Sequence, residues 1–511
     1  MAAKLLMRTP QGFFGPGGGG WEQMPQPPRW FGTSNQVCGF YPFGVGTGRP
    51  TNGAPLGRDM NTGSAVCTDH DALFRAGVIS SPSAFEFGLN GLGKSTTAQT
   101  VIGGQVGRGL TPGIWDPIKG EHVQWAEELD ATVVSVGPRA RHQLNLLSPG
   151  PLGYAAARIG GAVGKELLQL ARAKAIDLVR TCVRLARSDD RGGPSISTGE
   201  DTALVAMVDT ILEREPNPST AHLLQAFDHP SERMLTLARQ QDAASFHARF
   251  SDLGETLQWL LVGEMGQMLD GNNPVEFTPG NRGGFCFDTS SINASETKLL
   301  SAAMLSTWSL GMDAIDAHWE LAQHELRLQT EAAAQGEAYE PQVTWGGYTT
   351  LMDEFWYPLR ACEGMVELID RLSRTNRSVG TAELKITHSP KDLLSLKNEE
   401  DRQKAKGFIE RSGLLLLMGL SEEDLLTLNK VRALTPREIR EVVSFTQAPN
   451  WTGARRKNGP PPAPPGAGKV MLKINERVGI PVKMLRTKTQ MSLHNTNARY
   501  DDQAAVPAIQ S

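Results

Sequence analysis

Short apolar runs alternate with longer amphipathic stretches along much of this sequence. Between residues 80 and 136, apolar runs are separated by glycine-rich or polar turns and by helix-like segments. The expected elements are, in chain order, a strand at 84–87, a helix starting over 96–103, a strand at 113–117, a helix at 123–129 and a strand at 132–136. This alternation is typical of an α/β fold with a parallel sheet.

Residues 155 to about 270 have a different pattern, because strand signals are absent and apolar residues recur at helical spacing. The segment GKELLQLARAKAIDLVRTCVRLAR, which begins at Gly164, repeats apolar side chains every three or four residues. That spacing places them along one face of a helix. The sequence therefore predicts an all-helical insertion within the α/β region.

Strand signals resume after the insertion and continue almost to the C-terminus. The expected elements are a strand at 284–288, a long helix at 295–331, strands at 348–353, 384–387 and 414–419, and a terminal hairpin formed by VMLKIN and GIPVKML. Glycine and proline clusters occur near both ends, as GPGGGG and GVGTGRP in the first 60 residues and as NGPPPAPPGAG at 458–468. Such composition favours tails and linkers over regular elements.

Composition and charge mainly exclude whole classes of protein. The chain has 511 residues, 40% hydrophobic and 21% charged, so it can bury a sizeable core, and wholesale disorder is disfavoured. Its formal net charge is −4, from 51 Lys and Arg against 55 Asp and Glu. No overall basic field therefore indicates a nucleic-acid binder, and any such contact has to be local.

Cysteine usage and apolar run lengths indicate a compartment. The five cysteines are scattered and contain no CxxC pair; they are Cys38, Cys67, Cys182, Cys286 and Cys362. Such a set fits neither a disulfide framework nor a zinc ribbon, which favours a reducing environment. The start lacks an apolar signal region, and the most apolar later run, 414–420, is too short to cross a bilayer. We therefore expect a cytoplasmic protein that is soluble without a membrane anchor.

A phosphate-binding motif is the strongest local signal. The segment GLNGLGKST, from Gly88 to Thr96, matches GxxxxGK[ST] in full and lies between an apolar strand and a helical segment. In this motif backbone N–H groups point at one anion, the lysine faces the β and γ phosphates, and the serine hydroxyl binds Mg²⁺. The expected residues for ATP and Mg²⁺ are Gly88, Asn90, Gly91, Leu92, Gly93, Lys94, Ser95 and Thr96. The alternative is a chance glycine-rich turn.

Two acids, Asp353 and Glu354, follow the apolar run YTTLM that begins at Tyr348. An acid at the end of a strand can hold Mg²⁺ through water, and the next acid can orient and polarise an attacking water. We therefore expect Asp353 on the Mg²⁺ side and Glu354 as the catalytic base. The alternative is that both acids only begin an exposed helix.

Basic residues occur on both sides of the strand expected at 384–387. Arg371, Arg374 and Arg377 precede it at intervals of three residues, and on a helix they share part of one basic face. An arginine presented across a subunit boundary can neutralise transition-state charge, whereas a solvated basic helix face is the alternative. His388 follows the strand, where a polar side chain can sense the γ phosphate; a histidine in a turn is an equally good interpretation.

Together these segments resemble one family, the ATPases of conjugative type IV secretion systems in the FtsK-HerA branch of P-loop motors, and more narrowly their actinobacterial conjugal-transfer ATP-binding members. The matching pieces occur in the order GLNGLGKST, WDPIKGEHVQWAEELDATVVSVG, TTLMDEFW, LSRTNRSVGTAELKITHSPKDL, ERSGLLLLMGL and NERVGIPVKML, over roughly residues 55–490. The sequence departs from the family's usual DPKGE at Ile118, and His388 replaces its common sensor glutamine.

The resemblance implies a RecA-like P-loop NTPase core with a parallel-rich sheet, a homo-hexamer, and ATP hydrolysis that powers DNA or protein transfer. It implies phosphate and Mg²⁺ contacts for Lys94 and Ser95 and the Walker B roles for Asp353 and Glu354. It places Arg377 at the arginine position before the sensor strand, and Arg374 is a second candidate for contact across subunits. The implied partners are membrane-embedded secretion channel proteins and a DNA cargo, and the implied location is the inner face of the cell membrane.

The predicted organisation has six parts: a Gly/Pro-rich tail or docking segment at 1–60, the first part of the RecA-like core at 61–152, the all-helical insertion at 153–272, the second part of the core at 273–457, a proline-rich linker at 458–468, and a C-terminal hairpin and tail at 469–511.

Two other functions are open at the level of sequence. A DNA-pumping coupling protein or FtsK-type translocase shares the chemistry but usually carries transmembrane helices or a DNA-reading domain, and neither is evident. An ATP-bound assembly scaffold with negligible turnover needs the phosphate cradle but no catalytic base, so the acids at 353 and 354 argue against it. The locally basic stretch at 455–488 can contact DNA phosphates, and a solvated surface explains it as well.

Overall fold

A mixed sheet organises the fold. The computed structural model describes residues 8–9, 12–13, 49–188, 195–271, 279–360, 366, 369–370, 380–394, 396, 398–447, 465–487 and 490. Across its 11-stranded sheet the order is β4 (Ala65–Cys67), β3 (Pro55–Asp59), β13 (Ile480–Met484), β12 (Lys469–Ile474), β11 (Leu414–Leu417), β5 (Ser83–Phe87), β10 (Thr381–Thr387), β9 (Tyr348–Met352), β6 (Thr111–Asp116), β8 (Phe285–Asp288) and β7 (Thr132–Ser135). The strands from β11 to β7 are parallel, and those from β12 to β4 continue the sheet antiparallel. A separate ribbon pairs β1 (Arg8–Thr9) with β2 (Gly12–Phe13).

The central strands are apolar because helices cover both faces of the sheet. In β5, Phe85 and Phe87 point into one apolar core and Ala84 into the other. The neighbouring strand β11 repeats this alternation, with Leu415 in the first core and Leu416 in the second. Burial on both faces therefore produces the mostly apolar runs from which these strands are predicted.

Each face of the sheet has its own set of helices. The core that contains Ala84 is covered by α2 (His70–Arg75), α3 (Lys94–Val106) and α4 (Val123–Glu128). The core that contains Phe85 is covered by α13 (Thr297–Ala334), α14 (Trp356–Leu359), α16 (Pro390–Leu394), α17 (Glu399–Arg411), α18 (Glu422–Asn429) and α19 (Pro436–Ser444). The sheet is thus the middle layer of a helix–sheet–helix arrangement, as predicted for an α/β fold.

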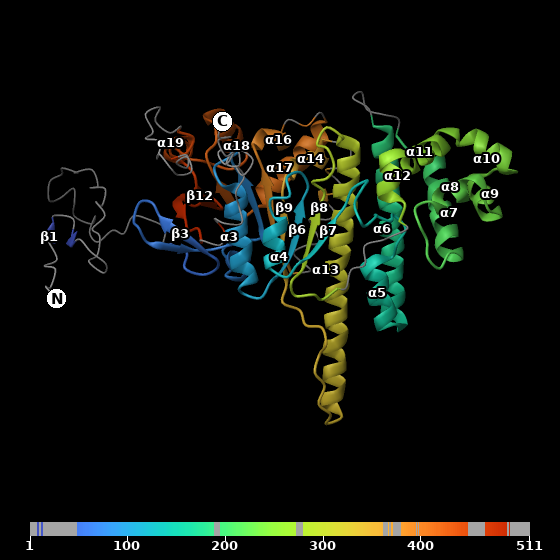
Figure 1. Ribbon diagram of the computed structural model, residues 1–511, viewed down its shortest axis with the longest axis horizontal. Coiled ribbons are helices and arrows are strands. Elements are labelled where there is room, and N and C mark those ends of the chain that lie inside the picture. The colour runs from blue at the N-terminus through green and yellow to red at the C-terminus, as the bar shows by residue number, and fades with distance from the viewer. Residues whose placement is uncertain are drawn as a thin grey trace, which may run out of the picture.

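A helical subdomain is inserted between β7 and β8, and it confirms the prediction of helices over residues 155–270. It consists of α5 (Gly150–Ile159), α6 (Gly161–Arg187), α7 (Thr198–Arg214), α8 (His222–Asp228), α9 (Glu232–Ala238), α10 (Ala243–Arg249), α11 (Ser251–Leu261) and α12 (Gly263–Leu269). Most of it lies to one side of the sheet, beyond α13 (Figure 1). Because α5 and α6 pack on α13, that helix joins the insertion to the sheet.

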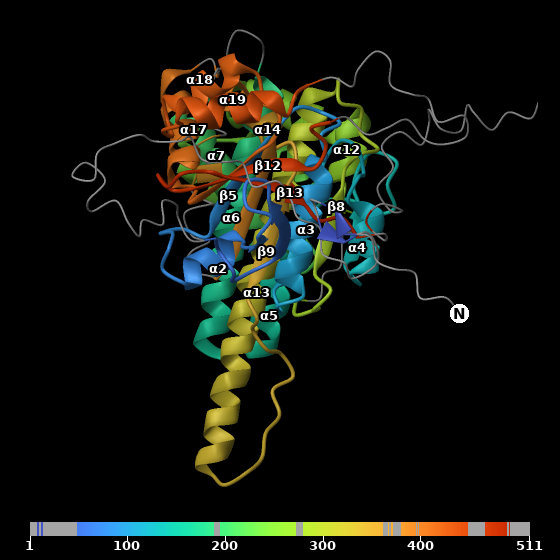
Figure 2. The same cartoon turned by 90° about the vertical axis from the view of Figure 1, so that its left-hand side faces the viewer.

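The α13 helix is 38 residues long, and its C-terminal half extends well beyond the body of the molecule (Figures 1 and 2). The chain then returns alongside it to enter β9. The described helices include none that is both long enough and apolar enough to cross a membrane.

The terminal parts of the sheet differ from the predicted organisation. Residues 1–60 are expected to form a tail, but β3 lies within them and pairs with β13. Its sequence, PLGRD, hides the strand because it contains proline and glycine; Pro55 begins the strand, and Gly57 allows the backbone of Lys483 to approach closely. The predicted C-terminal hairpin forms from β12 and β13, and it also extends the main sheet through pairing of β12 with β11. The other predicted boundaries stay predictions.

Candidate nucleotide-binding site

Four of the predicted segments meet at one edge of the sheet. Gly88 follows β5, Asp116 ends β6, Asp353 follows β9 and His388 follows β10. These strands are parallel, so their carboxyl ends lie together, and ligands of open α/β sheets bind at this edge. The topology therefore brings the motif after β5 next to the two acids after β9.

The glycine-rich loop after β5 has the conformation that a phosphate cradle needs. Gly91 and Gly93 have φ angles of +80° and +99°, in the left-handed region that favours glycine. The helix α3 begins at Lys94, and no side chain caps its N-terminus. The first backbone N–H groups of a helix have no partner within the helix, so they are available to an anion. The local geometry thus fits a bound phosphate.

The Lys94 ammonium group is fully hydrogen-bonded within the loop and to the neighbouring strand. Its Nζ donates to the Gly88 carbonyl at 2.9 Å and to Asn90 Oδ1 at 3.2 Å, and it lies 3.1 Å from His388 Nδ1. Burial lowers the pKa of Lys94, while the nearby carboxyl groups of Glu86, Asp353 and Glu354 oppose that shift. The lysine is therefore already surrounded by acceptors and negative charge at the place where phosphates are expected.

Glu354 is buried and held at both of its carboxylate oxygens. His388 Nε2 lies 3.0 Å from Oε1, and Trp356 Nε1 donates to Oε2 at 2.7 Å. Glu354 also has a φ of +47°, which is rare for a residue with a side chain and is typical of strained functional positions. His388 thereby connects Lys94 to Glu354, so one hydrogen-bonded chain joins the phosphate loop to the end of β9.

Asp353 is buried beside a buried histidine that the sequence analysis did not single out. Its Oδ1 accepts a hydrogen bond from the Glu354 backbone N–H at 2.9 Å, and its Oδ2 lies 3.5 Å from His122 Nε2. That distance permits an ion pair without a well-formed hydrogen bond. Burial favours the neutral acid, but His122 outweighs it and holds the pKa of Asp353 below its usual value. Asp353 is thus kept in the anionic form that a cation requires.

His122 is in turn positioned by residues of the DPIKGE segment and of α3. Its backbone N–H donates to Asp116 Oδ2 at 2.6 Å, and its Nδ1 lies 3.3 Å from Gln99 Nε2. Burial lowers the pKa of an imidazole, but Asp353 and Asp116 overcome that effect and raise the pKa of His122. Burial raises the pKa of Asp116 to about 6, although His122 opposes the shift. His122 therefore influences the pKa of Asp116, which ends β6, and the pKa of Asp353, which follows β9.

Ser95 contacts a further acid from the same segment. Its hydroxyl donates to Glu121 Oε2, and Glu121 Oε1 lies 3.7 Å from Lys119 Nζ. The hydroxyl that is expected on Mg²⁺ thus faces a carboxylate, which is the type of oxygen ligand that Mg²⁺ prefers. Glu121 joins Asp353 and Ser95 as a group that could hold the ion.

Glu86, the penultimate residue of β5, is a buried acid close to the loop. Its side chain is fully buried, and neither carboxyl oxygen has a hydrogen-bond partner among the described residues. Burial raises the pKa of Glu86 well above its ordinary value, while Lys94 opposes the shift. The buried environment of Glu86 therefore favours the neutral acid, and Lys94 favours the carboxylate.

The structure brings together most of the residues predicted for the site. Lys94, Ser95, Asp353, Glu354 and His388 all lie at the same sheet edge, and both acids are buried instead of opening an exposed helix. Their chemical roles stay predictions. The three arginines of the predicted basic face lie outside the described residues: Arg371, Arg374 and Arg377.

Sequence reasoning missed several polar residues of the site: Glu86, Gln99, Glu121 and His122. Glu86 carried one signal, a charge within an otherwise apolar strand. Gln99, Glu121 and His122 lie in segments whose residue spacing indicates no particular chemistry, and their contacts depend on which strands are adjacent in the sheet.

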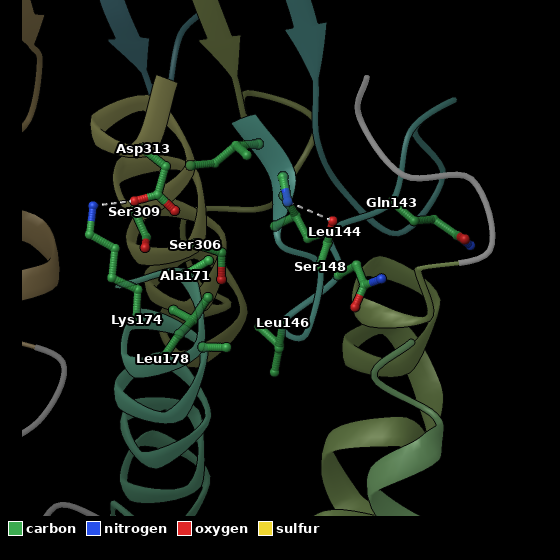
Figure 3. A pocket seen from close by; sticks show the side chains of 14 residues that line it. Gln143, Leu144, Leu146, Ser148, Ala171, Lys174, Leu178, Ser306, Ser309 and Asp313 are labelled. Carbon is green, nitrogen blue, oxygen red and sulfur yellow. Dashed lines mark hydrogen bonds and ion pairs between the residues drawn. The ribbon is translucent and has the colours of Figure 1, made fainter. Parts of the chain in front are cut away.

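A second concave region lies away from these residues, between α6, α13 and the loop at 143–150 (Figure 3). Lys174 and Asp313 form an ion pair on the side of the pocket that α6 and α13 line, and Lys174 Nζ also lies 2.8 Å from Asp316 Oδ2. Burial raises the pKa of Asp313 to about 6, although Lys174 opposes the shift. None of the residues of the sheet-edge site lines this pocket.

Comparison with known proteins identifies the fold. No protein family and no curated protein matches this sequence. Among solved structures, VirB4 of Thermoanaerobacter pseudethanolicus is similar, with a TM-score of 0.58 and 15% identity over 87% of this chain and 100% of that one. The conjugative coupling protein TrwB, solved with ADP and Mg²⁺, is similar with a TM-score of 0.45 and 12% identity over 82% of this chain and 88% of that one. The likeness to VirB4 confirms the predicted RecA-like α/β core with a helical insertion.

Proposed function

We propose that this chain is a Mg²⁺-dependent ATPase that powers DNA or protein transfer through a conjugative type IV secretion system. The observation that carries the proposal is the hydrogen-bonded chain from Lys94 through His388 to Glu354. A glycine-rich loop alone would account for the binding of a nucleotide. A buried carboxylate aligned with the phosphate lysine supports hydrolysis as well.

The nucleotide would be held by the N-terminus of α3, where Lys94 and the backbone N–H groups face the phosphates. Ser95, Asp353 and Glu121 are the groups that would hold Mg²⁺, directly or through water. When bound, this ion neutralises the charge that develops on the phosphate oxygens. His122 favours the anionic form of Asp353, so the carboxylate does not have to lose a proton when Mg²⁺ binds.

Glu354 is the proposed general base, which accepts a proton from the attacking water. Trp356 and His388 fix its carboxylate, so its orientation is set before the reaction. Asp353 and Glu354 differ in environment, because Asp353 faces His122 whereas Glu354 faces His388 and Trp356. This difference supports the separation of a metal-side acid from a base.

The assembly and the partners belong to the same proposal. A homo-hexamer would place Arg377 or Arg374 of one subunit near the phosphates of the next. The resemblance of the sequence motifs to conjugative type IV secretion ATPases supports a motor at the inner face of the membrane, with channel proteins as partners and DNA as one cargo.

The test is steady-state ATP hydrolysis with Mg²⁺ by the full chain and by Glu354→Gln, over a range of protein concentrations and with or without single- and double-stranded DNA. Loss of a general base lowers turnover by roughly 10²–10⁴-fold, and nucleotide affinity should be retained. Glu337→Gln, in the exposed segment that follows α13, is the matched control and should behave as the wild type.

Turnover that rises steeply with protein concentration would support active sites shared in a ring, and stimulation by DNA would favour a DNA cargo. Clear ATP binding with equal, near-zero turnover in both proteins would overturn the motor and favour an assembly scaffold.

A further inference from the structure

Arg486, which follows β13, lies directly against the glycine-rich loop. A Cβ atom at Gly93 would lie only 2.5 Å from Nη2 of Arg486. A Cβ atom at Gly468 would lie 3.1 Å from Nη2 and 3.3 Å from Nε. The guanidinium group therefore rests against two residues without side chains, one in the phosphate loop and one at the start of β12.

Backbone hydrogen bonds fix this position of the arginine. The N–H of Gly468 donates to the Leu92 carbonyl at 3.0 Å, and the N–H of Met484 donates to the Gly468 carbonyl at 2.8 Å. The N–H of Leu485, immediately before the arginine, donates to the Leu56 carbonyl at 2.7 Å. The β12–β13 hairpin is thus attached both to the phosphate loop and to the neighbouring strand, and its geometry presents Arg486 to the loop.

The Arg486 guanidinium has no anionic partner in the described part of the chain, where it forms neither an ion pair nor a hydrogen bond. Burial lowers its pKa, and no carboxylate offsets that effect. The charged groups nearby are cations: Lys483 donates to the Ala467 carbonyl at 2.6 Å, and Lys469 lies 6.0 Å from the centre of the Phe445 ring. Arg486 is half-buried, and its unpaired positive charge beside a phosphate cradle is costly unless an anion binds there.

We propose that Arg486 is a ligand of the nucleotide phosphates, supplied in cis by the C-terminal hairpin. The chemical class of the ligand is a di- or triphosphate chain, which a planar guanidinium can bind through two parallel hydrogen bonds. Lys469 and Lys483 add positive potential without direct contact. This inference rests on the proposed function, because it adds a contact to the same nucleotide site.

The experiment measures the affinity of the full chain for ATP, ADP and pyrophosphate by calorimetry in the presence of Mg²⁺. Removal of one charge-assisted contact should weaken binding by about 10–100-fold. We expect Arg486→Gln to show this loss for all three ligands and Arg486→Lys to show a smaller one. Arg58→Gln removes an exposed arginine from β3, the strand that pairs with β13, and should bind as the wild type does.

Each of the alternative results contradicts a specific part of this proposal. If Arg486→Gln binds all three ligands like the wild type, Arg486 is not a ligand. If it loses ATP and ADP but keeps pyrophosphate, the guanidinium contacts the base or ribose, and the phosphate assignment is wrong. If Arg486→Gln does not fold, wild-type affinity of Arg486→Lys for all three ligands overturns the assignment.

Lys94→Ala separates this inference from the proposed function. Failure of the inference alone would leave binding by the wild type and loss of binding in Lys94→Ala. A wild type that binds neither ATP nor ADP would overturn the proposed function and this inference together.

Discussion

Two buried charged sites lie on neighbouring strands and on opposite faces of the sheet. On β10, Glu383 and Lys385 bond to each other, and their side chains are 4% and 2% exposed. Lys385 also lies 3.5 Å from Ser83 Oγ and 5.6 Å from the centre of the Phe355 ring. On β5, by contrast, Glu86 has no hydrogen-bond partner among the described residues.

The difference separates a structural ion pair from a group that belongs to a ligand site. The β10 pair has its partners within the fold, so removal of one member leaves an uncompensated charge. Glu86 is influenced instead by Lys94 and Asp353, which face the expected nucleotide. We therefore expect changes in the pair to act on stability and changes around Glu86 and Asp353 to depend on pH or ligand.

The largest effect is expected for Glu383→Ala. It leaves the Lys385 ammonium buried without its carboxylate, which lowers the free energy of unfolding by about 3–5 kcal/mol. Denaturant unfolding measures the loss. The control is the double variant Glu383→Leu with Lys385→Met, which should recover most of it because an apolar pair of similar volume needs no partner. A loss below about 1 kcal/mol, the range of an exposed ion pair, would show that the pair contributes no more than a surface pair.

An intermediate effect is expected for His122→Phe, which removes the group that keeps Asp353 anionic. Loss of such an orienting residue lowers activity by about 10–100-fold. Because His122 lowers the pKa of Asp353, its removal should raise that pKa and move the acidic limb of the kcat profile to higher pH. Separate measurement of kcat and KM against pH checks this shift.

His122→Gln is the matched variant, since it keeps a donor but not the charge, and it should restore part of kcat. An acidic limb that stays in place in both variants would contradict the role assigned to His122.

The smallest effect is expected for Glu86→Gln, which should stabilise the protein at alkaline pH, because it removes an acid whose charged form is unfavourable when buried. The pKa of Glu86 is higher in the folded state than in the unfolded state, so the folded state keeps a proton that the unfolded state has lost. The stability contributed by the acid is therefore complete below about pH 4.3 and declines as pH rises towards the folded pKa. Thermal melts of both proteins between pH 4 and pH 9 should diverge as pH rises. A constant difference at every pH would count against a raised pKa of Glu86 in the folded state.

The central fold could be predicted because the patterns that indicate its elements lie within short segments of the sequence. The strand β11 is a continuous apolar run, β5 and β9 are mostly apolar, and the phosphate loop has a fixed spacing of glycines, lysine and serine. The insertion followed from helical periodicity over more than 100 residues. By contrast the sequence analysis did not predict β3, because Pro55 and Gly57 give this strand a composition that is typical of turns.

The unpredicted part of the site depends on which distant segments become neighbours. His122 contacts Asp353 only because β6 and β9 are adjacent, and Arg486 reaches the phosphate loop only because the hairpin extends the sheet past β11. No spacing in the sequence encodes either contact.

The three hydrogen bonds of Lys94 mean that ligand binding here is an exchange of partners. An ammonium group has three N–H donors, and all three are used in this structure. A phosphate can engage Lys94 only by displacing one acceptor, and displacement of His388 is transmitted directly to Glu354. His388 therefore couples phosphate binding to the proposed base, because a ligand that takes over its hydrogen bond from Lys94 would change the contact that His388 makes with Glu354.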